Sequence, residues 1–160
     1  MQHQRLVKLR FLAEPSDVNF GGKVHGGAVM KWIDQAGYTC ASLWSASYCV
    51  TAYVGGIRFL APILIGDIVE LTAKIIYTGN TSMHIAVDVY ARNPREGKKI
   101  KTTHCIIVMV AMEDGKTKSV PKWTPITGED TALENYAKIL MERRKDIEEE
   151  MRPFIEGNVD

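Results

Sequence analysis

The chain has 160 residues, of which 46% are hydrophobic and 24% are charged, and its formal net charge is +1. These values are typical of one globular domain, and the near-neutral charge argues against a general nucleic-acid-binding protein, which usually has a strongly basic face. No segment approaches the roughly 20 apolar residues that cross a bilayer, and the amino-terminal segment lacks the apolar core of a signal peptide. We therefore expect a cytoplasmic protein that binds neither nucleic acid nor a membrane.

The cysteine and histidine residues form no disulfide or metal-binding pattern. Cys40, Cys49 and Cys105 have no CxxC spacing, so we expect buried free thiols in a reducing compartment. His84 and His104 could face each other on neighbouring strands, but no third residue has the spacing of a metal ligand. The sequence therefore predicts no metal site.

The spacing of apolar residues predicts a strand, one long helix and then four more strands. Residues 5–12 alternate imperfectly between charged and aliphatic side chains, and a loop rich in proline, asparagine and glycine follows at 15–23. Helical spacing runs from Gly26 to about Trp44. A period of two then marks strands at 48–60, 67–77, 83–90 and 101–112, with a hairpin turn at Gly79-Asn80.

The same patterns predict which side chains face the core. On the helix they are Val29, Ile33, Ala36, Cys40 and Leu43, and on two strands they are Val69, Leu71, Ala73, Ile75, Tyr77, Met83, Ile85, Val87 and Val89. The last strand is apolar on both faces, and a single helix cannot cover both sides of a sheet. We therefore expect a second copy of the chain to cover the other face, which makes the protein an oligomer.

The carboxyl-terminal part of the chain has a different character. We divide the chain into a domain at 1–125 and a helical extension at 126–160, with a charged helix from Glu129 to about Phe154. Pairs such as Arg144–Glu148 and Lys145–Glu149 would support this helix in solvent. A thin apolar seam, which we interpret as a packing or oligomer-stabilising surface, is formed by Leu133, Tyr136, Leu140, Ile147 and Met151.

An acid on the long helix raises the question of function. Asp34 lies at the edge of the apolar stripe among small and apolar neighbours, with Lys31 as the one possible ion-pair partner on the same helix. Partial burial would make the carboxylate a stronger base, whereas pairing with Lys31 would make it an ordinary surface acid. Spacing alone favours neither interpretation.

The segment His25-Gly26-Gly27 opens this helix. Backbone N–H groups at a helix amino terminus are unpaired, and glycine leaves them uncovered, so they could stabilise the oxyanion formed when an acyl group is attacked. The alternative is that the two glycines only permit close packing of helix against strand. For His25 we favour a structural or orienting role over proton transfer.

Several segments together resemble the acyl-CoA thioesterases of the hot-dog fold, in the branch of the bacterial YciA and brain acyl-CoA hydrolase types. The similar residues are Pro15, Asn19, the block VHGGAVMKWIDQAG at 24–37, GNTSMHIAVDV at 79–89 and AMEDGKTKSVP at 111–121. The resemblance covers about residues 5–125. It implies an α+β hot-dog fold, in which an antiparallel sheet of five or six strands wraps around one central helix, here with an additional carboxyl-terminal helix.

The resemblance also implies an activity and a site. Proteins of this type hydrolyse acyl-CoA to a free acid and coenzyme A without a cofactor, between the subunits of a homodimer that commonly assembles into a trimer of dimers. By analogy, Asp34 is the general base or the nucleophile, the Gly26 and Gly27 amides form the oxyanion hole, and Asn19 joins the acid of the partner subunit. Further residues expected to contact coenzyme A are Thr81 and Ser82 near the pantetheine, and Arg58, Arg92, Arg95, Lys98 and Lys99 near the phosphates.

Two other functions stay open at this stage. A non-catalytic acyl-CoA sensor or carrier could use the same fold, although no DNA-binding module is evident in the sequence. A dehydratase or hydratase of the same fold is a weaker alternative, because such enzymes pair a histidine and an acid in another arrangement. Release of free thiol from acyl-CoA distinguishes all three.

Overall fold

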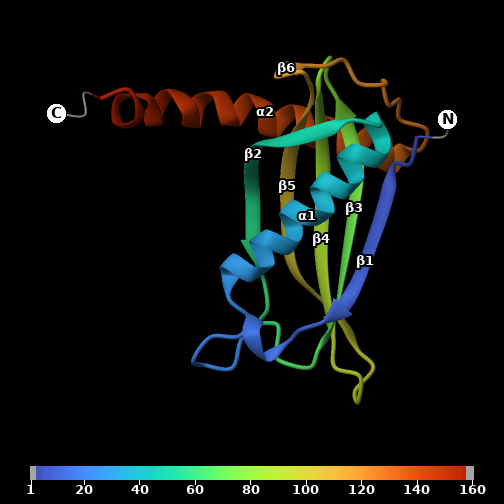
Figure 1. Cartoon of the computed structure of the whole chain (residues 1–160), viewed down its shortest axis with the longest axis vertical. Helices are drawn as coiled ribbons and strands as arrows, with labels where there is room; N and C mark the ends of the chain where they lie inside the picture. Colours follow the sequence, from blue (N-terminus) through green and yellow to red (C-terminus); the bar gives the residue numbers. More distant parts are fainter. Residues whose placement is uncertain (1–2, 158–160) are drawn as a thin grey trace. The chain divides into compact units, whose positions relative to one another are not determined.

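The computed structural model describes residues 3–157, and these fall into two compact units that divide between Trp123 and Thr124. The first unit contains the sheet and the central helix (Figure 1). Its elements are β1 (Leu6–Leu12), the short 3-10 helix η1 (Pro15–Asp17), α1 (Gly26–Ser45), β2 (Tyr48–Phe59), β3 (Ile68–Thr78), β4 (Ser82–Arg92), β5 (Lys99–Glu113) and β6 (Lys116–Thr117). The strands pair antiparallel in the order β1-β3-β4-β5-β2, and β6 pairs with β5.

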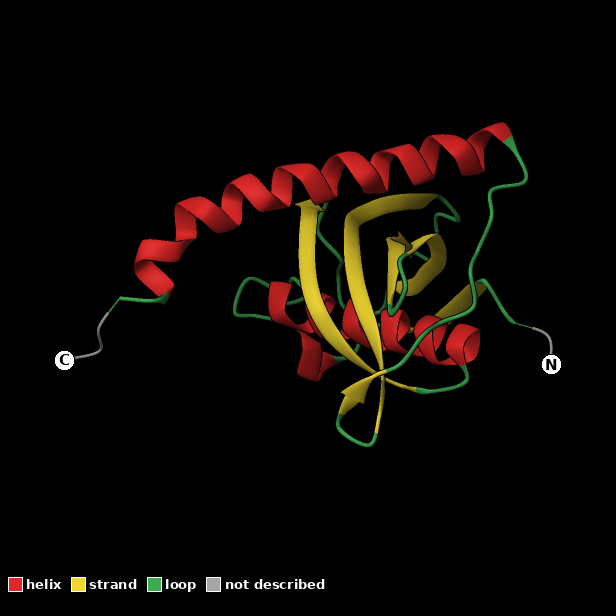
Figure 2. Ribbon diagram, turned by 90° about the horizontal axis from the view of Figure 1, so that it is seen from above, coloured by secondary structure: helices red, strands yellow, loops and turns green. Residues whose placement is uncertain are grey.

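Helix α1 lies across one face of this sheet, as Figures 1 and 2 show from two directions. The predicted inward sets of β3 and β4 are confirmed from Val69 to Ile75 and from Met83 to Val89, and these side chains are fully buried. On α1 the predicted stripe is correct up to Cys40. Leu43 was predicted inward but is 46% exposed, because Trp44 takes the core position and donates its indole N–H to the carbonyl of Pro121 at 2.8 Å.

A β-bulge changes the face of one predicted core residue. The register of β3 with β4 shifts between Ile75 and Tyr77, so Ile76 is buried and the alternation moves by one position. Tyr77, which we predicted on the inward face, instead places its ring 5.1 Å from the ring of His84. His84 therefore contacts Tyr77, and it does not pair with His104 in the strand register.

Strand β2 forms one edge of the sheet because it pairs with β5 alone. Its register shifts twice, between Thr51 and Tyr53 and between Gly55 and Arg58. An edge strand presents unpaired backbone groups and is a natural surface for pairing with another chain. Large apolar side chains are exposed along this edge and on the adjoining face of α1, namely Met30, Tyr38, Tyr48, Val54 and Phe59.

The second unit consists mainly of α2 (Gly128–Ile155). Thr127 and Asp130 form a capping box at its start, since the Thr127 hydroxyl accepts from the Asp130 amide and the Asp130 carboxylate accepts from the Thr127 amide. The predicted pair Arg144–Glu148 is present at 2.7 Å, whereas Lys145 pairs with Glu142 at 3.2 Å.

The architecture is the predicted α+β arrangement, an antiparallel sheet packed on one long helix with a further helix at the carboxyl end. Within residues 3–157, no helix combines the length and the apolar character needed to cross a membrane. The expectation that the other face of β5 needs a second copy to cover it is wrong for the middle of the strand, because Ile106 and Val108 on that face are already buried in the single chain.

Candidate active site

A cavity of about 430 Å³ lies beside the first turn of α1. It brings together two of the predicted site residues, Asn19 from the loop after η1 and Gly26 from the helix start. Lys23, which the sequence analysis did not single out, adds a positive charge to its wall. The remaining lining residues are mostly apolar and come from the loop before α1, from α1, β2, the segment after β2, and β5: Val24, Val29, Phe59, Leu60, Ala61, Pro62, Ile63 and Thr103.

Asn19 organises the loop that enters this cavity. Its Oδ1 accepts hydrogen bonds from the amides of Gly21 at 2.9 Å and Lys23 at 3.3 Å, which is the side-chain turn that asparagine commonly makes. Both bonds use the carbonyl oxygen, so the Nδ2 group with its two N–H donors takes no part in them. Asn19 can therefore hold the loop and still offer a donor to a bound molecule.

The glycines at the start of α1 are not required for packing within the chain. A Cβ added to Gly27 would meet nothing within 4 Å, and one added to Gly26 would make only an ordinary contact with Phe59 at 3.7 Å. The glycine that does permit close packing is Gly37, where an added Cβ would lie 2.8 Å from Cγ2 of Ile107. The packing interpretation of Gly26 and Gly27 is therefore wrong for the single chain, in which both residues are exposed.

His25 precedes α1 as its N-cap, and its side chain makes no capping hydrogen bond. Its backbone holds the helix start, since its amide donates to the carbonyl of Asp17 at 2.8 Å and its carbonyl accepts from the Val29 amide at 3.1 Å. The exposed imidazole lies outside the core. The structural or orienting role that we favoured for His25 stays a prediction.

Asp34 lies two turns further along α1 and is exposed in the single chain, so the partial burial that we predicted is not found there. The surface alternative placed it against Lys31, but its carboxylate instead accepts a hydrogen bond from the hydroxyl of Thr51, with Oγ1 and Oδ1 2.5 Å apart. Thr51 also lies 3.6 Å from the sulfur of Met109. The sequence analysis did not predict this contact between Thr51 and Asp34.

The acid and the glycine amides are far apart within one chain. Asp34 lies eight positions after Gly26 on one continuous helix, which corresponds to about 12 Å along its axis. A reacting carbonyl needs its oxyanion donors and its nucleophile within about 3 Å. Within one chain the two groups are therefore farther apart along the helix than such a site requires.

Thr81 lies in the turn between β3 and β4 and Ser82 begins β4, at the end of the sheet away from the α1 start (Figure 1). A Cβ added to Gly79 would lie 2.6 Å from the Ser82 hydroxyl, so this side chain folds over its own turn. The carbonyl of Thr81 accepts from the amide of Ala111 at 3.1 Å. Within one chain, neither residue reaches the cavity beside Gly26.

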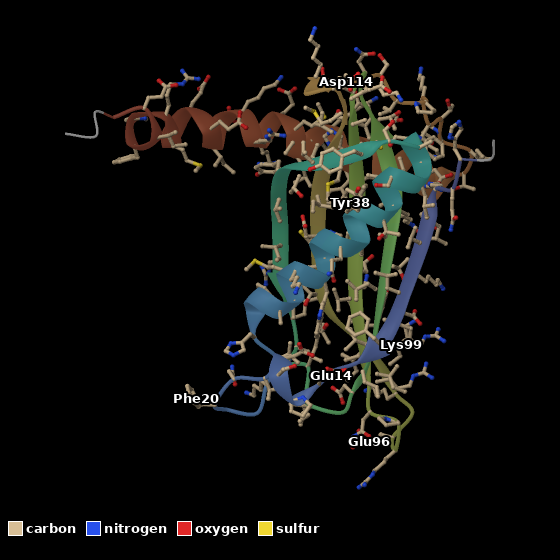
Figure 3. The ribbon with its side chains drawn as sticks, viewed as in Figure 1. Glu14, Phe20, Tyr38, Glu96, Lys99 and Asp114 are labelled. Atoms are coloured by element: carbon tan, nitrogen blue, oxygen red, sulfur yellow. The ribbon has the colours of Figure 1, made fainter. Side chains whose placement is uncertain are left out.

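Three of the predicted basic residues, Arg92, Arg95 and Lys98, lie in or next to the turn between β4 and β5. Figure 3 marks this turn by Glu96 and shows it at the same end of the molecule as Phe20, in the loop before α1. All three side chains are exposed. This turn thus supplies positive charge at the end of the sheet that holds the cavity.

The other two basic candidates, Arg58 and Lys99, lie on strands of the sheet. Arg58 is opposite His104 in the register of β2 with β5. Lys99 donates to Oε1 of Glu70 at 2.7 Å, and Arg10 donates to Oε2 at 2.5 Å. These hydrogen bonds, that from Lys99 first, lower the pKa of Glu70 from 4.5 to about 2. Lys99 is therefore committed to an internal ion pair.

The remaining titratable groups make no second catalytic cluster in the part of the chain that the structure describes. All three cysteines are free and buried, and burial raises the pKa of Cys40 to about 12 and of Cys105 to about 11. His104 Nδ1 lies 2.8 Å from Oδ1 of Asp88. Among residues 3–157, no three histidine, cysteine or acidic residues gather closely enough to hold a metal ion.

Comparison with known proteins identifies this arrangement. Residues 21–98 match the family model of the thioesterase superfamily. The acyl-CoA thioester hydrolase YciA of Salmonella typhimurium is 33% identical over 117 residues, which cover 71% of this chain and 88% of that protein. The sheet, its single central helix and the glycine-rich helix start thus define a hot-dog-fold protein. The chain belongs to the thioesterase superfamily, among the acyl-CoA thioester hydrolases.

Solved structures agree with this assignment. A hexameric acyl-CoA thioesterase is 33% identical and superimposes with a TM-score of 0.84 over 88% of this chain and 91% of that one. The acyl-CoA hydrolase of Staphylococcus aureus, solved with butyryl coenzyme A, is 28% identical, with a TM-score of 0.86 over 94% of this chain and 93% of the other. The fold and the family predicted from the sequence are thereby confirmed.

Proposed function

We propose that this protein hydrolyses the thioester of acyl-CoA, releasing a free acid and coenzyme A, at a site that two copies of the chain build together. The observation that carries the proposal is a distance: Gly26 and Asp34 lie about 12 Å apart along α1. Packing within the chain does not require Gly26 or Gly27, and the exposed Asp34 carboxylate is held by a hydrogen bond. The names of its relatives as acyl-CoA thioester hydrolases support the reaction. The butyryl coenzyme A bound to the Staphylococcus aureus enzyme supports the substrate class.

A homodimer is the smallest assembly that completes the site. The exposed edge of β2 and the adjoining face of α1 carry large apolar side chains, including Tyr38 (Figure 3), whose ring lies 6.2 Å from that of Tyr48 on β2. Pairing this surface with its own copy would bury these side chains and satisfy the free edge of β2. Asp34 and Thr51 border this surface, so pairing would bring them toward the cavity of the other copy.

In the proposed reaction, Asp34 of one copy acts on the thioester carbonyl held by the other. As a general base, Asp34 takes a proton from water as the oxygen of that water bonds to the carbonyl carbon. As a nucleophile, it forms an anhydride that water then hydrolyses. In both cases the Gly26 and Gly27 amides and the Nδ2 group of Asn19 donate to the oxyanion, and the carbon–sulfur bond breaks to release coenzyme A.

The Staphylococcus aureus enzyme gives independent support for this set. Its solved variants include an asparagine-to-alanine, an aspartate-to-alanine and a threonine-to-alanine replacement. The replaced asparagine and aspartate are as far apart in sequence as Asn19 and Asp34, and the replaced aspartate and threonine as far apart as Asp34 and Thr51. We assign Thr51 to orienting the Asp34 carboxylate.

The coenzyme A moiety would extend along the basic end of the sheet. Arg92, Arg95 and Lys98 supply positive charge for its phosphates, and Lys23 lies at the cavity itself. Arg58 remains a candidate, while Thr81 and Ser82 could take part only from the partner copy or through a long pantetheine arm. The proposed chemistry uses no cofactor.

The full assembly that we propose is a trimer of such dimers. Hexameric relatives support it, including the acyl-CoA thioesterase with 33% identity and the thioesterase of Yersinia pestis. Three buried free thiols suit a reducing compartment, so we propose that the protein acts in the cytoplasm.

The test is thiol release from acyl-CoAs of two to eighteen carbons, followed by complementation between two inactive variants. Asp34→Ala removes the acid, and Gly27→Val covers the amide. Random pairing of the two chains in a co-expressed sample makes half of the dimers mixed, each with one intact site, so about a quarter of wild-type activity should return. No recovery would show that the site lies within one chain, whereas tight acyl-CoA binding by the wild type without turnover would show a sensor or carrier.

A further inference from the structure

The carboxyl-terminal half of α2 has an apolar face that its own unit does not cover. Ile147 is 51% exposed, Met151 48% and Phe154 89%, and Ile155 beside them is exposed as well. This length of helix contains no residue assigned to the active site. Its exposed apolar face therefore calls for another explanation.

The apolar positions of this face follow the spacing of a coiled coil. Leu140, Arg144, Ile147, Met151 and Phe154 succeed one another at intervals of four, three, four and three residues, which is the seam at which two helices interlock. The single polar member, Arg144, hydrogen-bonds through Nε to Glu148 Oε1 at 2.7 Å. A polar residue at one seam position is a known means of fixing the orientation of a helix pair.

The charges next to the seam are divided into two blocks. Arg143, Arg144 and Lys145 precede Ile147, and three glutamates follow it at 148–150. In a parallel, in-register pair Arg144 would meet Arg144 in the seam, where like charges repel. In an antiparallel pair the basic block of one helix lies along the acidic block of the other, and Arg144 meets Ile147.

We propose that residues 140–154 of α2 form an antiparallel coiled coil with the same segment of a second copy of this chain. One register satisfies both the seam and the charges. When Leu140 packs on Met151 of the second copy, Arg143 lies opposite Glu150, and symmetry repeats this ion pair on the other side. The alternative register places Glu150 opposite Glu150, where like charges repel.

The pairing is tested by measuring the mass of the full-length assembly by light scattering. Ile147→Lys puts a charge into the seam and should lower the mass by breaking the contact between copies. Ile139→Lys is a matched control, because Ile139 has the same side chain and a similar exposure of 53% but lies outside the seam. Equal masses for both variants and the wild type would overturn the proposal.

A charge exchange separates pairing between copies from effects within one helix. Arg143→Glu or Glu150→Arg alone sets like charges against each other and should lower the mass, whereas the double variant R143E/E150R should restore it. Positions 143 and 150 are seven residues apart, beyond the three or four over which side chains meet on one helix, so rescue reports contact between two copies. Rescue also distinguishes the antiparallel pair, because a parallel pair does not bring these positions together. A double variant no larger than the single ones would contradict the proposal.

Discussion

The hydroxyl of Thr51 donates a hydrogen bond to Oδ1 of Asp34, with 2.5 Å between the two oxygens. The bond joins the middle of α1 to the edge strand β2 and fixes the direction of the carboxylate. A threonine at this place leaves the second carboxylate oxygen, Oδ2, available to a substrate or to water. This geometry leads to the first prediction.

Thr51→Val keeps the shape of the side chain but removes the donor to Asp34. We expect kcat to fall by about tenfold or more, equivalent to about 1.4 kcal/mol of transition-state stabilisation, with little change in KM. Thr39→Val is the matched control, because the Thr39 hydroxyl bonds only to the carbonyl of Gln35 on the same helix. Steady-state thiol release measures both. An unchanged kcat in the Thr51 variant would remove Thr51 from the site.

Gly27 and Gly37 should respond in opposite ways to alanine. Gly27→Ala meets no neighbouring atom, so the melting temperature should be unchanged or higher, while kcat falls because a methyl group stands beside the amide. Gly37→Ala drives a methyl group against Ile107 and should destabilise the fold by about 1–3 kcal/mol. Urea unfolding and thiol release together separate the two effects. A fully active Gly27→Ala would be inconsistent with an oxyanion role for its amide.

Two substitutions of Asn19 divide its loop role from its proposed catalytic role. Asn19→Asp keeps an oxygen that can accept from the amides of Gly21 and Lys23, but it loses the two donors of Nδ2. We expect this variant to keep wild-type stability and to lose about 10²–10³ in kcat, the usual effect of removing one oxyanion donor. Asn19→Ala should lose both the loop bonds and the donor. Activity in the aspartate variant close to wild type would mean that Asn19 serves the loop alone.

Glu70 should make stability depend on pH in the acid range. Its ion pairs with Lys99 and Arg10 hold its folded-state pKa near 2, below the ordinary 4.5, so its contribution is complete above pH 4.5 and is lost as the pH falls through about 2. Because Arg10 is largely exposed, we expect Glu70→Gln to lower the free energy of unfolding by only about 1–2 kcal/mol at pH 7.

The difference between Glu70→Gln and wild type should shrink steadily when urea unfolding is repeated from pH 5 to pH 2. Glu113→Gln is a suitable control, since Glu113 pairs with Lys118 at 3.5 Å on the surface and should contribute little. A difference that stays constant over this range would mean that the ionised form of Glu70 is not what stabilises the fold.

Much of the fold could be predicted because the side chains that pack in the core must be apolar, and their spacing along the chain follows the period of the helix or strand. The long helix was predicted from Gly26 to about Trp44 and spans Gly26–Ser45, since its buried face repeats with the helical period. Tyr77 was placed on the wrong face, because a β-bulge shifts the alternation and leaves no clear mark in the sequence. Leu43 and Trp44 are adjacent, and only packing decides which of them enters the core.

The site was predictable only in part. Asn19 and Gly26 are close in sequence and do line one cavity, but Thr51 approaches Asp34 from another element, 17 residues away. A signal for Thr51 existed, because the alternation of β2 puts it on the same face as the buried Cys49. A hydroxyl on an otherwise inward face is a reason to look for a polar partner.

Gly26 and Asp34 belong to the same continuous helix, eight positions apart, so no loop movement can bring the two groups together. If the site is shared as we propose, an isolated subunit is folded but catalytically inactive. Specific activity then becomes a function of enzyme concentration. Dilution that dissociates the dimer would abolish activity, and concentrating the protein again would restore it.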